Sequence, residues 1–261
     1  MCTLIILNDL TGEWPLVFAA NRDEFYGRPS APPGFISTAP PVFAGRDLRA
    51  GGTWMGVTPT GFFAGLTNQR QGGLAAADRR SRGEVVVNVL RAGGRAAARR
   101  YLAGLDPRQY NPFNLVFGEV GDLEVVYAWD TIRFAVVPPG VHILPNDVLD
   151  SAAFPKVERA RDLLADLPAD GPGIVARLRA TLADTTPPAS LPSAPDSPFP
   201  DDLRHALHAL CVRTPAYGTR SSSIVALRPS GVARYLFADG PPDVTPFVDV
   251  TGALYGGDRD R

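Results

Sequence analysis

The chain has 261 residues, of which 45% are hydrophobic, and its 26 basic residues nearly balance 27 acidic ones, for a formal charge of -1. This length can bury one large core, and we expect a single domain over residues 1–261. The near-neutral charge gives no electrostatic case for nucleic acid or an anionic membrane as a partner. Two cysteines are too few for a disulfide framework, so we expect a reducing, cytoplasmic setting.

The sequence also argues against membrane insertion and against several familiar classes of site. No stretch approaches the roughly 18 apolar residues of a spanning helix, and the amino terminus has neither the basic lead nor the apolar run of a secretory signal. There is no phosphate loop, no dinucleotide-binding glycine fingerprint and no serine elbow. We therefore expect no integral membrane segment and predict no cofactor and no metal.

The amino terminus offers a candidate nucleophile. Cys2 follows Met1 directly, and because its side chain is small, we expect the initiator methionine to be removed. Cys2 would then carry both a thiol and an α-amine, whose ordinary pKa of about 7.7–8 lets it act as a base at neutral pH. The alternative is that Cys2 is a small buried residue at a strand start, and both interpretations stay open here.

The first two strands form a predicted hairpin. Residues 3–8 are almost all apolar, residues 9–12 are typical of a turn, and residues 15–21 supply the antiparallel partner. Residues equidistant from the turn face each other, so the polar residues that follow the second strand fall at the same end of the sheet as the amino terminus. These polar residues are Asn21, Arg22, Asp23 and Glu24.

That polar run can have a chemical role or none. An arginine near a thiol favours the thiolate, and an aspartate near an α-ammonium can orient it, so this environment would activate Cys2. A charged run at a strand end is, however, usually only solvated. Proximity to the amino terminus favours the chemical interpretation.

Groups of strands and groups of helices alternate along the rest of the chain. Residues 27–41 are rich in proline, glycine and serine and predict an ordered loop over one end of the sheet. Further strands are expected at residues 51–57, 61–68, 114–118, 123–129, 134–137, 142–144, 221–227 and 232–237. Helices are expected at residues 81–90, 95–105, 156–165, 173–183 and 201–210, with a proline-rich loop over 185–200. Hairpin-length connections within each strand group predict an α+β protein with mostly antiparallel sheets covered by helices.

Three residues on the last predicted helix could form a ligand set. His205, His208 and Cys211 are spaced three apart, so they could share a face and hold a metal or haem. The same spacing marks an amphipathic stripe beside Leu207 and Leu210, and no carboxylate or further cysteine completes a set. We therefore favour a structural role for them.

Short ordered motifs spread over nearly the whole chain carry a family resemblance. They are Met1-Cys2-Thr3, Asn21-Arg22-Asp23-Glu24, Gly51-Gly52-Thr53-Trp54-Met55-Gly56, Leu66-Thr67-Asn68, Ser81-Arg82-Gly83, Phe113-Asn114-Leu115, Phe154-Pro155-Lys156-Val157 and Tyr217-Gly218-Thr219-Arg220-Ser221-Ser222. Together they resemble the NRDE family, also called the transport and Golgi organisation family. That family is similar to N-terminal nucleophile hydrolases of the penicillin V acylase and bile salt hydrolase type, which implies a four-layer αββα sandwich.

The resemblance implies roles for residues near the amino terminus. Cys2 would be both nucleophile and base, and Arg22 and Asp23 would flank it. Those hydrolases separate the arginine from the aspartate by two residues, whereas here the two are adjacent. Asn21 and Glu24 are therefore competing candidates, assigned to substrate binding.

Further site residues follow from the later motifs. Asn68 and Asn146 fall where the resemblance places the asparagines that stabilise an oxyanion, although Pro145 stands before Asn146 where a small residue is usual. Arg220 would lie in the pocket wall and anchor a carboxylate, or would be a strand-end charge. Trp54 would belong to an apolar-walled substrate pocket, or to the core.

Two functions from different classes follow. The first is an amidase-like enzyme: Cys2 attacks the linear amide of a small acylated substrate, Asn68 and Asn146 hold the oxyanion, and water resolves the thioester. The second, also implied by the resemblance, is a haem or lipid binding or trafficking protein on the same scaffold, without catalysis. Haem binding would then depend on His142, His205, His208 or Cys211.

Overall fold

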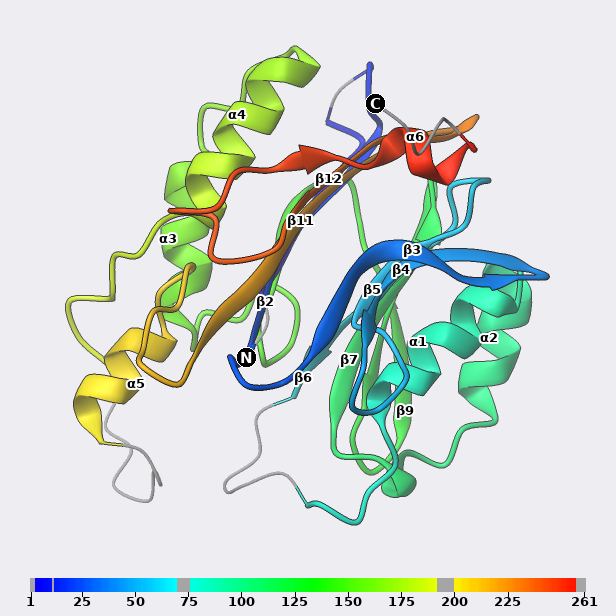
Figure 1. Ribbon diagram of the computed structural model, residues 1–261, viewed down its shortest axis with the longest axis horizontal. Coiled ribbons are helices and arrows are strands. Elements are labelled where there is room, and N and C mark those ends of the chain that lie inside the picture. The colour runs from blue at the N-terminus through cyan, green and yellow to red at the C-terminus, as the bar shows by residue number, and fades with distance from the viewer. Residues whose placement is uncertain (1–2, 11, 70–75, 192–199, 257–261) are drawn as a thin grey trace.

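The computed structural model of the protein describes residues 3–10, 12–69, 76–191 and 200–256. Within these residues the chain forms two antiparallel sheets packed face to face, with helices on both outer faces (Figure 1). The layers therefore run helices, sheet, sheet, helices. This arrangement confirms the predicted α+β class and the four-layer αββα sandwich.

One sheet, sheet A, carries the start of the described chain. Its strands are β1 (Thr3–Asn8), β2 (Leu16–Phe25), β10 (Gly140–Leu144), β11 (Tyr217–Arg228), β12 (Gly231–Ala238) and β13 (Val248–Asp249). They lie in the order β10-β1-β2-β11-β12-β13. All residues of β1 are buried, as its unbroken apolar run predicts for a strand covered on both faces.

The predicted hairpin of β1 and β2 is present, but its second strand is longer than expected. The register pairs Thr3 with Asn21 and Asn8 with Leu16. β11 pairs with β2 as far as Phe25, so residues 21–24 are part of the strand. The polar run thus lies inside β2 and not after it.

The other sheet, sheet B, is built from consecutive strands. They are β3 (Ser30–Thr38), β4 (Pro41–Asp47), β5 (Met55–Val57), β6 (Phe63–Asn68), β7 (Phe113–Glu119), β8 (Asp122–Ala128) and β9 (Ile132–Val136), in that spatial order. The prediction of a loop over residues 27–41 is wrong, because β3 occupies most of it. β3 is an edge strand, and its register with β4 skips Pro32 and Pro33, which cannot donate ladder hydrogen bonds.

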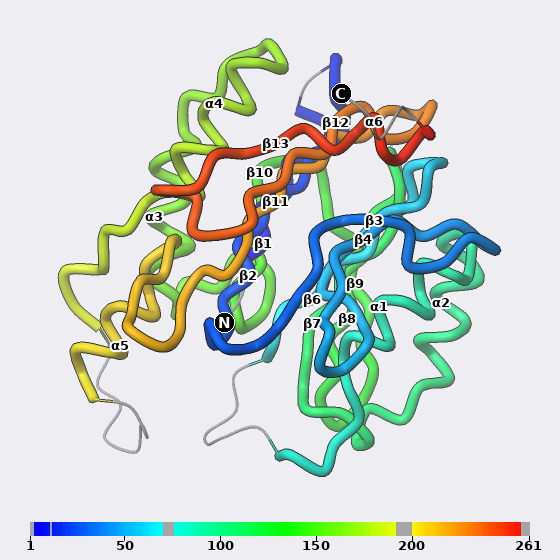
Figure 2. Tube along the Cα trace, in the orientation of Figure 1, coloured from blue at the N-terminus to red at the C-terminus, as the bar shows by residue number. Residues whose placement is uncertain are grey.

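Helices cover the outer face of each sheet (Figure 2). On sheet B lie α1 (Arg82–Arg91) and α2 (Arg95–Ala103), and on sheet A lie α3 (Pro155–Leu163) and α4 (Gly171–Leu182). Shorter helices are η1 (Pro107–Gln109), α5 (Asp201–Leu207) and α6 (Thr251–Leu254). The side chain of Ser81 caps α1 by accepting a hydrogen bond from the backbone N–H of Gly83.

Strand alternation divides the apolar residues of sheet A between two cores. Leu4, Ile6, Leu16 and Phe18 pack between the sheets, whereas Ile5, Leu7, Val17 and Ala19 pack against the helices of sheet A. Phe18 stacks on Phe63 of sheet B, with ring centroids 3.5 Å apart. This packing determines which face each following residue of β2 presents.

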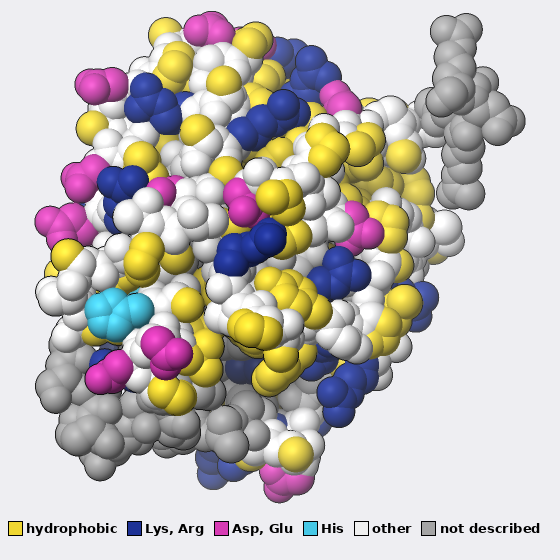
Figure 3. Space-filling view, turned by 60° about the vertical axis from the view of Figure 1, so that its left-hand side comes forward, with side chains coloured by type: hydrophobic (Ala, Val, Ile, Leu, Met, Phe, Trp, Pro, Cys, Tyr) yellow, Lys and Arg dark blue, Asp and Glu magenta, His cyan; other side chains and the backbone are white. Residues whose placement is uncertain are grey.

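The outer surface carries mixed charge. On the face in Figure 3, basic and acidic side chains are interspersed, and hydrophobic side chains lie between them. Among the helices of the described residues, none has the length and apolar character needed to cross a bilayer.

Candidate active site

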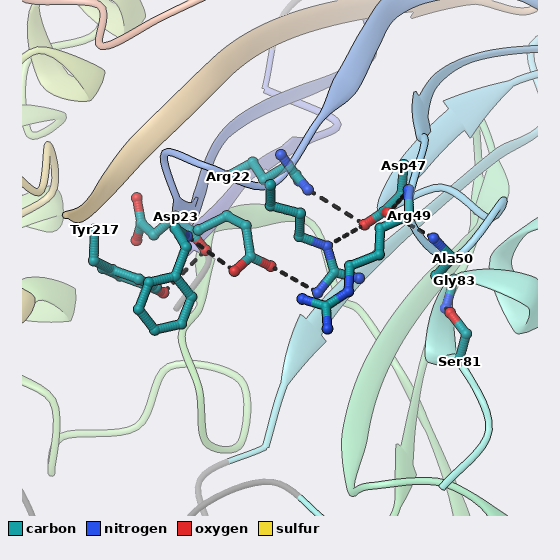
Figure 4. Close-up of polar contacts among 11 residues, drawn as sticks. Arg22, Asp23, Asp47, Arg49, Ala50, Ser81, Gly83 and Tyr217 are labelled. Atoms are coloured by element: carbon teal, nitrogen blue, oxygen red, sulfur yellow. Dashed lines mark hydrogen bonds and ion pairs between the residues drawn. The ribbon is translucent and has the colours of Figure 1, made fainter. Parts of the chain in front are cut away.

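Arg22 and Asp23 lie on opposite faces of sheet A. Ala20, two residues before Arg22, packs in the core between the sheets, whereas Ala19 packs in the core beneath the helices. Because side chains alternate along a strand, Arg22 points to sheet B and Asp23 points to the helical layer. Figure 4 shows the two side chains pointing apart. The pair expected to flank one nucleophile is thus divided between two environments.

On the sheet B side, Arg22 is held as a buried cation. Its side chain is 5% exposed, and its Nη2 lies 3.4 Å from Oδ2 of Asp47. Its guanidinium carbon lies 4.4 Å from the centre of the Trp54 ring. Asp47 also accepts a hydrogen bond from Nε of Arg28 at 2.7 Å. Burial alone would raise the pKa of Asp47, but hydrogen bonds from Arg28 and from two backbone N–H groups lower it below the ordinary value.

Glu24 continues this chain of charges outward. It is on the same face of β2 as Arg22 and lies 3.5 Å from Nη1 of Arg28 in an ion pair. Arg28 in turn contacts Asp47, so the order of alternating charges is Glu24, Arg28, Asp47 and Arg22 (Figure 4). Glu24 is thus connected to Arg22 through Arg28 and Asp47.

On the helical side, Asp23 lies in a buried polar cluster. Its Oδ1 accepts a hydrogen bond from Thr219 Oγ1 at 2.8 Å. Burial raises the pKa of Asp23, while the positive charge of Lys156 and the hydrogen bond from Thr219 oppose that rise. Lys156 on α3 donates from Nζ to Oγ1 of Thr3 at 3.3 Å. This cluster lies directly behind the first described residue of β1.

Asn21 has a structural role. Its Nδ2 donates to the backbone carbonyls of Leu182 and Leu210, at 2.8 Å and 2.9 Å, and its Oδ1 accepts from Ser222 Oγ at 2.5 Å. These bonds tie β2 to the end of α4 and to the segment after α5. The side chain of this candidate for substrate binding therefore points to the helices.

The two asparagines expected at an oxyanion site lie together. Asn146 follows β10 in sheet A, and Asn68 ends β6 in sheet B. Nδ2 of Asn146 donates to the backbone carbonyl of Asn68 at 2.7 Å. Asn146 is 2% exposed, and its Oδ1 has no hydrogen-bond partner among the described residues.

A third buried asparagine holds this junction, and sequence reasoning assigned it no role. Nδ2 of Asn114, in β7, donates to the carbonyl of Asp147 at 2.7 Å and to Thr67 Oγ1 at 3.1 Å. Thr67 Oγ1 donates to the carbonyl of Pro145 at 2.9 Å. The residues on both sides of Asn146 are thus tied to sheet B. The available signal was an asparagine inside an otherwise apolar strand, a position that requires hydrogen-bond partners.

The strand register places residues of β10, β1, β2 and β11 side by side across sheet A. Leu144, Leu4, Ala20 and Ser223 are neighbours in one row that faces sheet B. In the next row Arg22 pairs with Ser221, whose buried Oγ has no hydrogen-bond partner among the described residues.

A narrow pocket with a volume of only about 10 Å³ lies between the sheets at this end. Its lining consists of Thr3, Leu4, Ala20, Asn21, Trp54, Met55, Gly65, Leu66 and Thr67. Trp54 therefore contributes both to the pocket wall and to the fixing of Arg22. A wider, open depression of about 510 Å³ lies beyond the end of β2 and includes no predicted site residue; its lining consists of Tyr26, Arg213, Thr214, Pro215, Pro241 and Val244.

Two predicted site residues stand apart from this arrangement. Cys2 lies outside the described residues, so its role as nucleophile stays a prediction. Arg220 is the residue at which the register between β11 and β2 shifts, and its Nη1 lies 3.0 Å from Oδ1 of Asp239 in an ion pair. Arg220 is not part of the pocket lining, which favours the strand-end charge over the carboxylate anchor.

The histidine and cysteine residues considered for haem do not assemble. α5 ends before His208, so His205, His208 and Cys211 do not share a helical face. His208 packs against Phe154, and Sγ of Cys211 donates to Asp243 at 3.5 Å. Burial raises the pKa of the Cys211 thiol to about 12. Within the part of the chain that the structure describes, no three His, Cys, Asp or Glu side chains are placed to bind a metal ion.

Comparison with solved structures shows that other proteins share this fold. An N-acylethanolamine-hydrolyzing acid amidase ortholog from Caenorhabditis elegans has a TM-score of 0.56 and 13% identity, with coverage of 88% of this chain and 93% of that one. Penicillin V acylase from Agrobacterium tumefaciens has a TM-score of 0.53 and 13% identity, with coverage of 97% and 88%. The chain therefore has a fold like that of the N-terminal nucleophile hydrolases.

Comparison of sequences identifies the family. Residues 1–237 match the family described as Transport and Golgi organisation 2. The Transport and Golgi organization protein 2 homolog of Bos taurus is 32% identical over 238 residues, which is 83% of each chain. The Homo sapiens homolog is 30% identical over 239 residues with the same coverage. The chain thus belongs to the Transport and Golgi organisation 2 family.

Proposed function

We propose that this protein is an N-terminal cysteine hydrolase that cleaves the linear amide bond of a small acylated substrate through a thioester. The observation that carries the proposal is the junction of Asn146 with Asn68, at the same end of the sandwich as buried Arg22. An amide donor and a cation, held in place before any substrate arrives, are what acyl transfer from a thiolate requires.

The proposal requires that the thiol of Cys2 lies in the same row of sheet A as Arg22. Cys2 is bonded to Thr3, which pairs with Asn21, the residue before Arg22. The positive charge of Arg22 would favour the thiolate. Asp47 and Trp54 hold that charge in place, so little reorganisation is needed during the reaction.

The chemistry follows from these roles. Once Met1 has been removed, the α-amine of Cys2 takes the proton of the thiol, and the sulfur attacks the substrate carbonyl. Asn68 and Asn146 stabilise the oxyanion, and its collapse breaks the C–N bond while the ammonium returns the proton to the leaving amine. Water, deprotonated by the same amine, then cleaves the thioester and releases the acid.

One further observation supports amide cleavage as the reaction class. The structurally similar proteins are named as an acid amidase and an acylase, although at 13% identity the likeness is one of fold.

Mass spectrometry combined with a thiol-reactive acylating probe tests the proposal. The purified protein should lack Met1, carry one label on Cys2, and turn over members of a panel of N-acyl amides. A Cys2→Ala variant should lose both label and turnover. Cys211→Ala is the matched control and should keep both, because burial raises the pKa of that thiol. Retained Met1, or a label that persists in Cys2→Ala, would rule the mechanism out.

A further inference from the structure

Lys156 is unusual in both composition and placement. It is the only lysine among the 26 basic residues of the chain, and it is 1% exposed. It lies in the first turn of α3, on the side that faces sheet A. Lysine is almost never fully buried unless its charge is paired. The burial of Lys156 therefore requires a physical explanation, whereas an exposed lysine would not.

The groups around Lys156 belong to the start of the two central strands. Its Nζ donates to Oγ1 of Thr3, the first described residue of β1, at 3.3 Å. Its charge also acts on Asp23 of β2, which lies on the same face of sheet A. The ammonium thus donates to a hydroxyl of β1 and acts electrostatically on a carboxyl group of β2. Thr3, which supplies the hydroxyl, is bonded to Cys2 in the sequence.

The choice of lysine over arginine has a physical reason. Arginine carries a large planar cation, whereas lysine carries a compact point charge with three donors that can be aimed at separate partners. On the exposed side of the same helix the basic residues are Arg159 and Arg161, which reach carboxylates at the surface. Behind Thr3 the ammonium of Lys156 acts as such a compact charge and donates to the hydroxyl of the strand.

We propose that Lys156 is a positioning residue of the candidate active site: its ammonium anchors Thr3 and places a positive charge on the face of β1 opposite to that of Arg22. This inference rests on the proposed function, since the groups served are the thiol and α-amine of Cys2. Two cations, one on each face, favour the thiolate and disfavour a third positive charge on the amine. Asp23 supplies the counter-charge that makes burial of Lys156 tolerable.

The pH dependence of Cys2 alkylation by iodoacetamide tests this role. Mass spectrometry distinguishes alkylation of Cys2 from alkylation of Cys211, and the rate of Cys2 alkylation is measured from about pH 5 to about pH 9. In a folded Lys156→Met protein the rate below the midpoint should fall about 10-fold, with the midpoint moved to higher pH by about one unit. Lys156→Arg should recover part of the rate by restoring the charge. Arg159→Met, which removes a cation from the exposed side of α3, should leave both quantities unchanged.

The outcomes separate the inference from the proposed function. A wild-type rate and midpoint in folded Lys156→Met would overturn the role of Lys156. If Cys2 of the wild-type protein reacts no faster than a cysteine in an unfolded peptide, the proposed function fails first, whatever the variant does.

A measurement on the wild-type sequence covers the case in which the variants do not fold. The single lysine gives one resonance when the protein is labelled with ¹³C at the lysine ε carbon, and its shift reports the protonation of Lys156. Carboxymethylation of Cys2 with iodoacetate adds a negative charge, whereas iodoacetamide adds none. Because coupling between two sites is reciprocal, Lys156 should titrate at higher pH in the carboxymethylated protein. Equal midpoints in the two adducts would contradict the proposal.

Discussion

The side-chain amide of Asn146 and the backbone carbonyl of Asn68 lie 2.7 Å apart and join the end of β10 in sheet A to the end of β6 in sheet B. A primary amide has two N–H groups, and this bond uses one of them. The contact with a carbonyl also determines which end of the amide is nitrogen. The second N–H is therefore the group that could stabilise a developing oxyanion.

Replacement of Asn146 by alanine should impair the reaction more than the fold. Loss of one oxyanion donor lowers the rate of acyl transfer by about 10²–10³-fold. The carbonyl of Asn68 also loses its donor, which should lower the free energy of unfolding by about 1–3 kcal/mol. Acylation of Cys2 by the probe and urea denaturation measure the two effects. Asn88→Ala, at an exposed position on α1, is the control and should change neither by a comparable amount.

Replacement of Asn21 by alanine should, in contrast, lower the stability of the protein more than it impairs the reaction. The two carbonyls that accept from Asn21 and the hydroxyl of Ser222 would lose a buried partner together. We expect the free energy of unfolding to fall by about 3 kcal/mol or more, since each orphaned buried group costs about 1–3 kcal/mol. Urea denaturation measures the loss. A variant of wild-type stability with defective substrate binding would instead give Asn21 the binding role.

His142 should make stability depend on pH on the alkaline side. Its Nδ1 lies 2.7 Å from Oδ2 of Asp150 and its Nε2 lies 3.0 Å from the carbonyl of Pro138. Both partners are acceptors, so only the doubly protonated ring satisfies both. The hydrogen bond with Asp150 raises the pKa of His142 above its ordinary value. The resulting stabilisation is complete below the ordinary histidine pKa and is lost as pH rises through the folded-state value.

Proton NMR and urea denaturation check the His142 prediction together. The imidazole of His142 should titrate above the ordinary histidine pKa of about 6.5. Asp150→Asn should lower the pH at which His142 is half protonated. The same variant should lack the loss of stability that accompanies deprotonation of His142 between about pH 6 and about pH 9. His205→Gln should leave that loss in place. A His142 midpoint at or below the ordinary value would contradict the assignment of an imidazolium ion.

Asp47 should make stability depend on pH on the acid side. Its pKa is lowered, so its contribution is complete above the ordinary carboxyl pKa and is lost as pH falls through the folded-state value. Asp47→Asn should therefore be less stable than the wild-type protein at neutral pH, because Arg22 and Arg28 lose their shared carboxylate. The difference in urea midpoint should shrink as the pH drops below about 4. A difference independent of pH would mean that packing, not charge, explains the loss.

Local pattern was sufficient for much of the fold. The apolar run of β1 and the turn after it determined a buried hairpin, and the register that follows brought residues 21–24 to the end of the sheet where the described chain begins. The grouping of strands and helices then determined an antiparallel α+β architecture. These features depend on neighbours in sequence, which is why periodicity could predict them.

Other features depended on partners far away in the chain. Pro32 and Pro33 argued against a strand, yet β3 forms because an edge strand needs hydrogen bonds on one side only. The predicted helix over residues 201–210 ends at Leu207, because the segment after it bends to let the carbonyl of Leu210 accept from Asn21.

For the candidate site, the sequence by itself determined which residue types are present: a cysteine after Met1, an arginine beside an aspartate, and asparagines at strand ends. Only the tertiary structure decided how they are used. It divided Arg22 from Asp23 across the two faces of sheet A, brought Asn146 to Asn68, and buried Lys156 behind Thr3. The physical reason is that the direction of a side chain depends on strand register and on sheet-to-sheet packing, and both are set by contacts between residues distant in sequence.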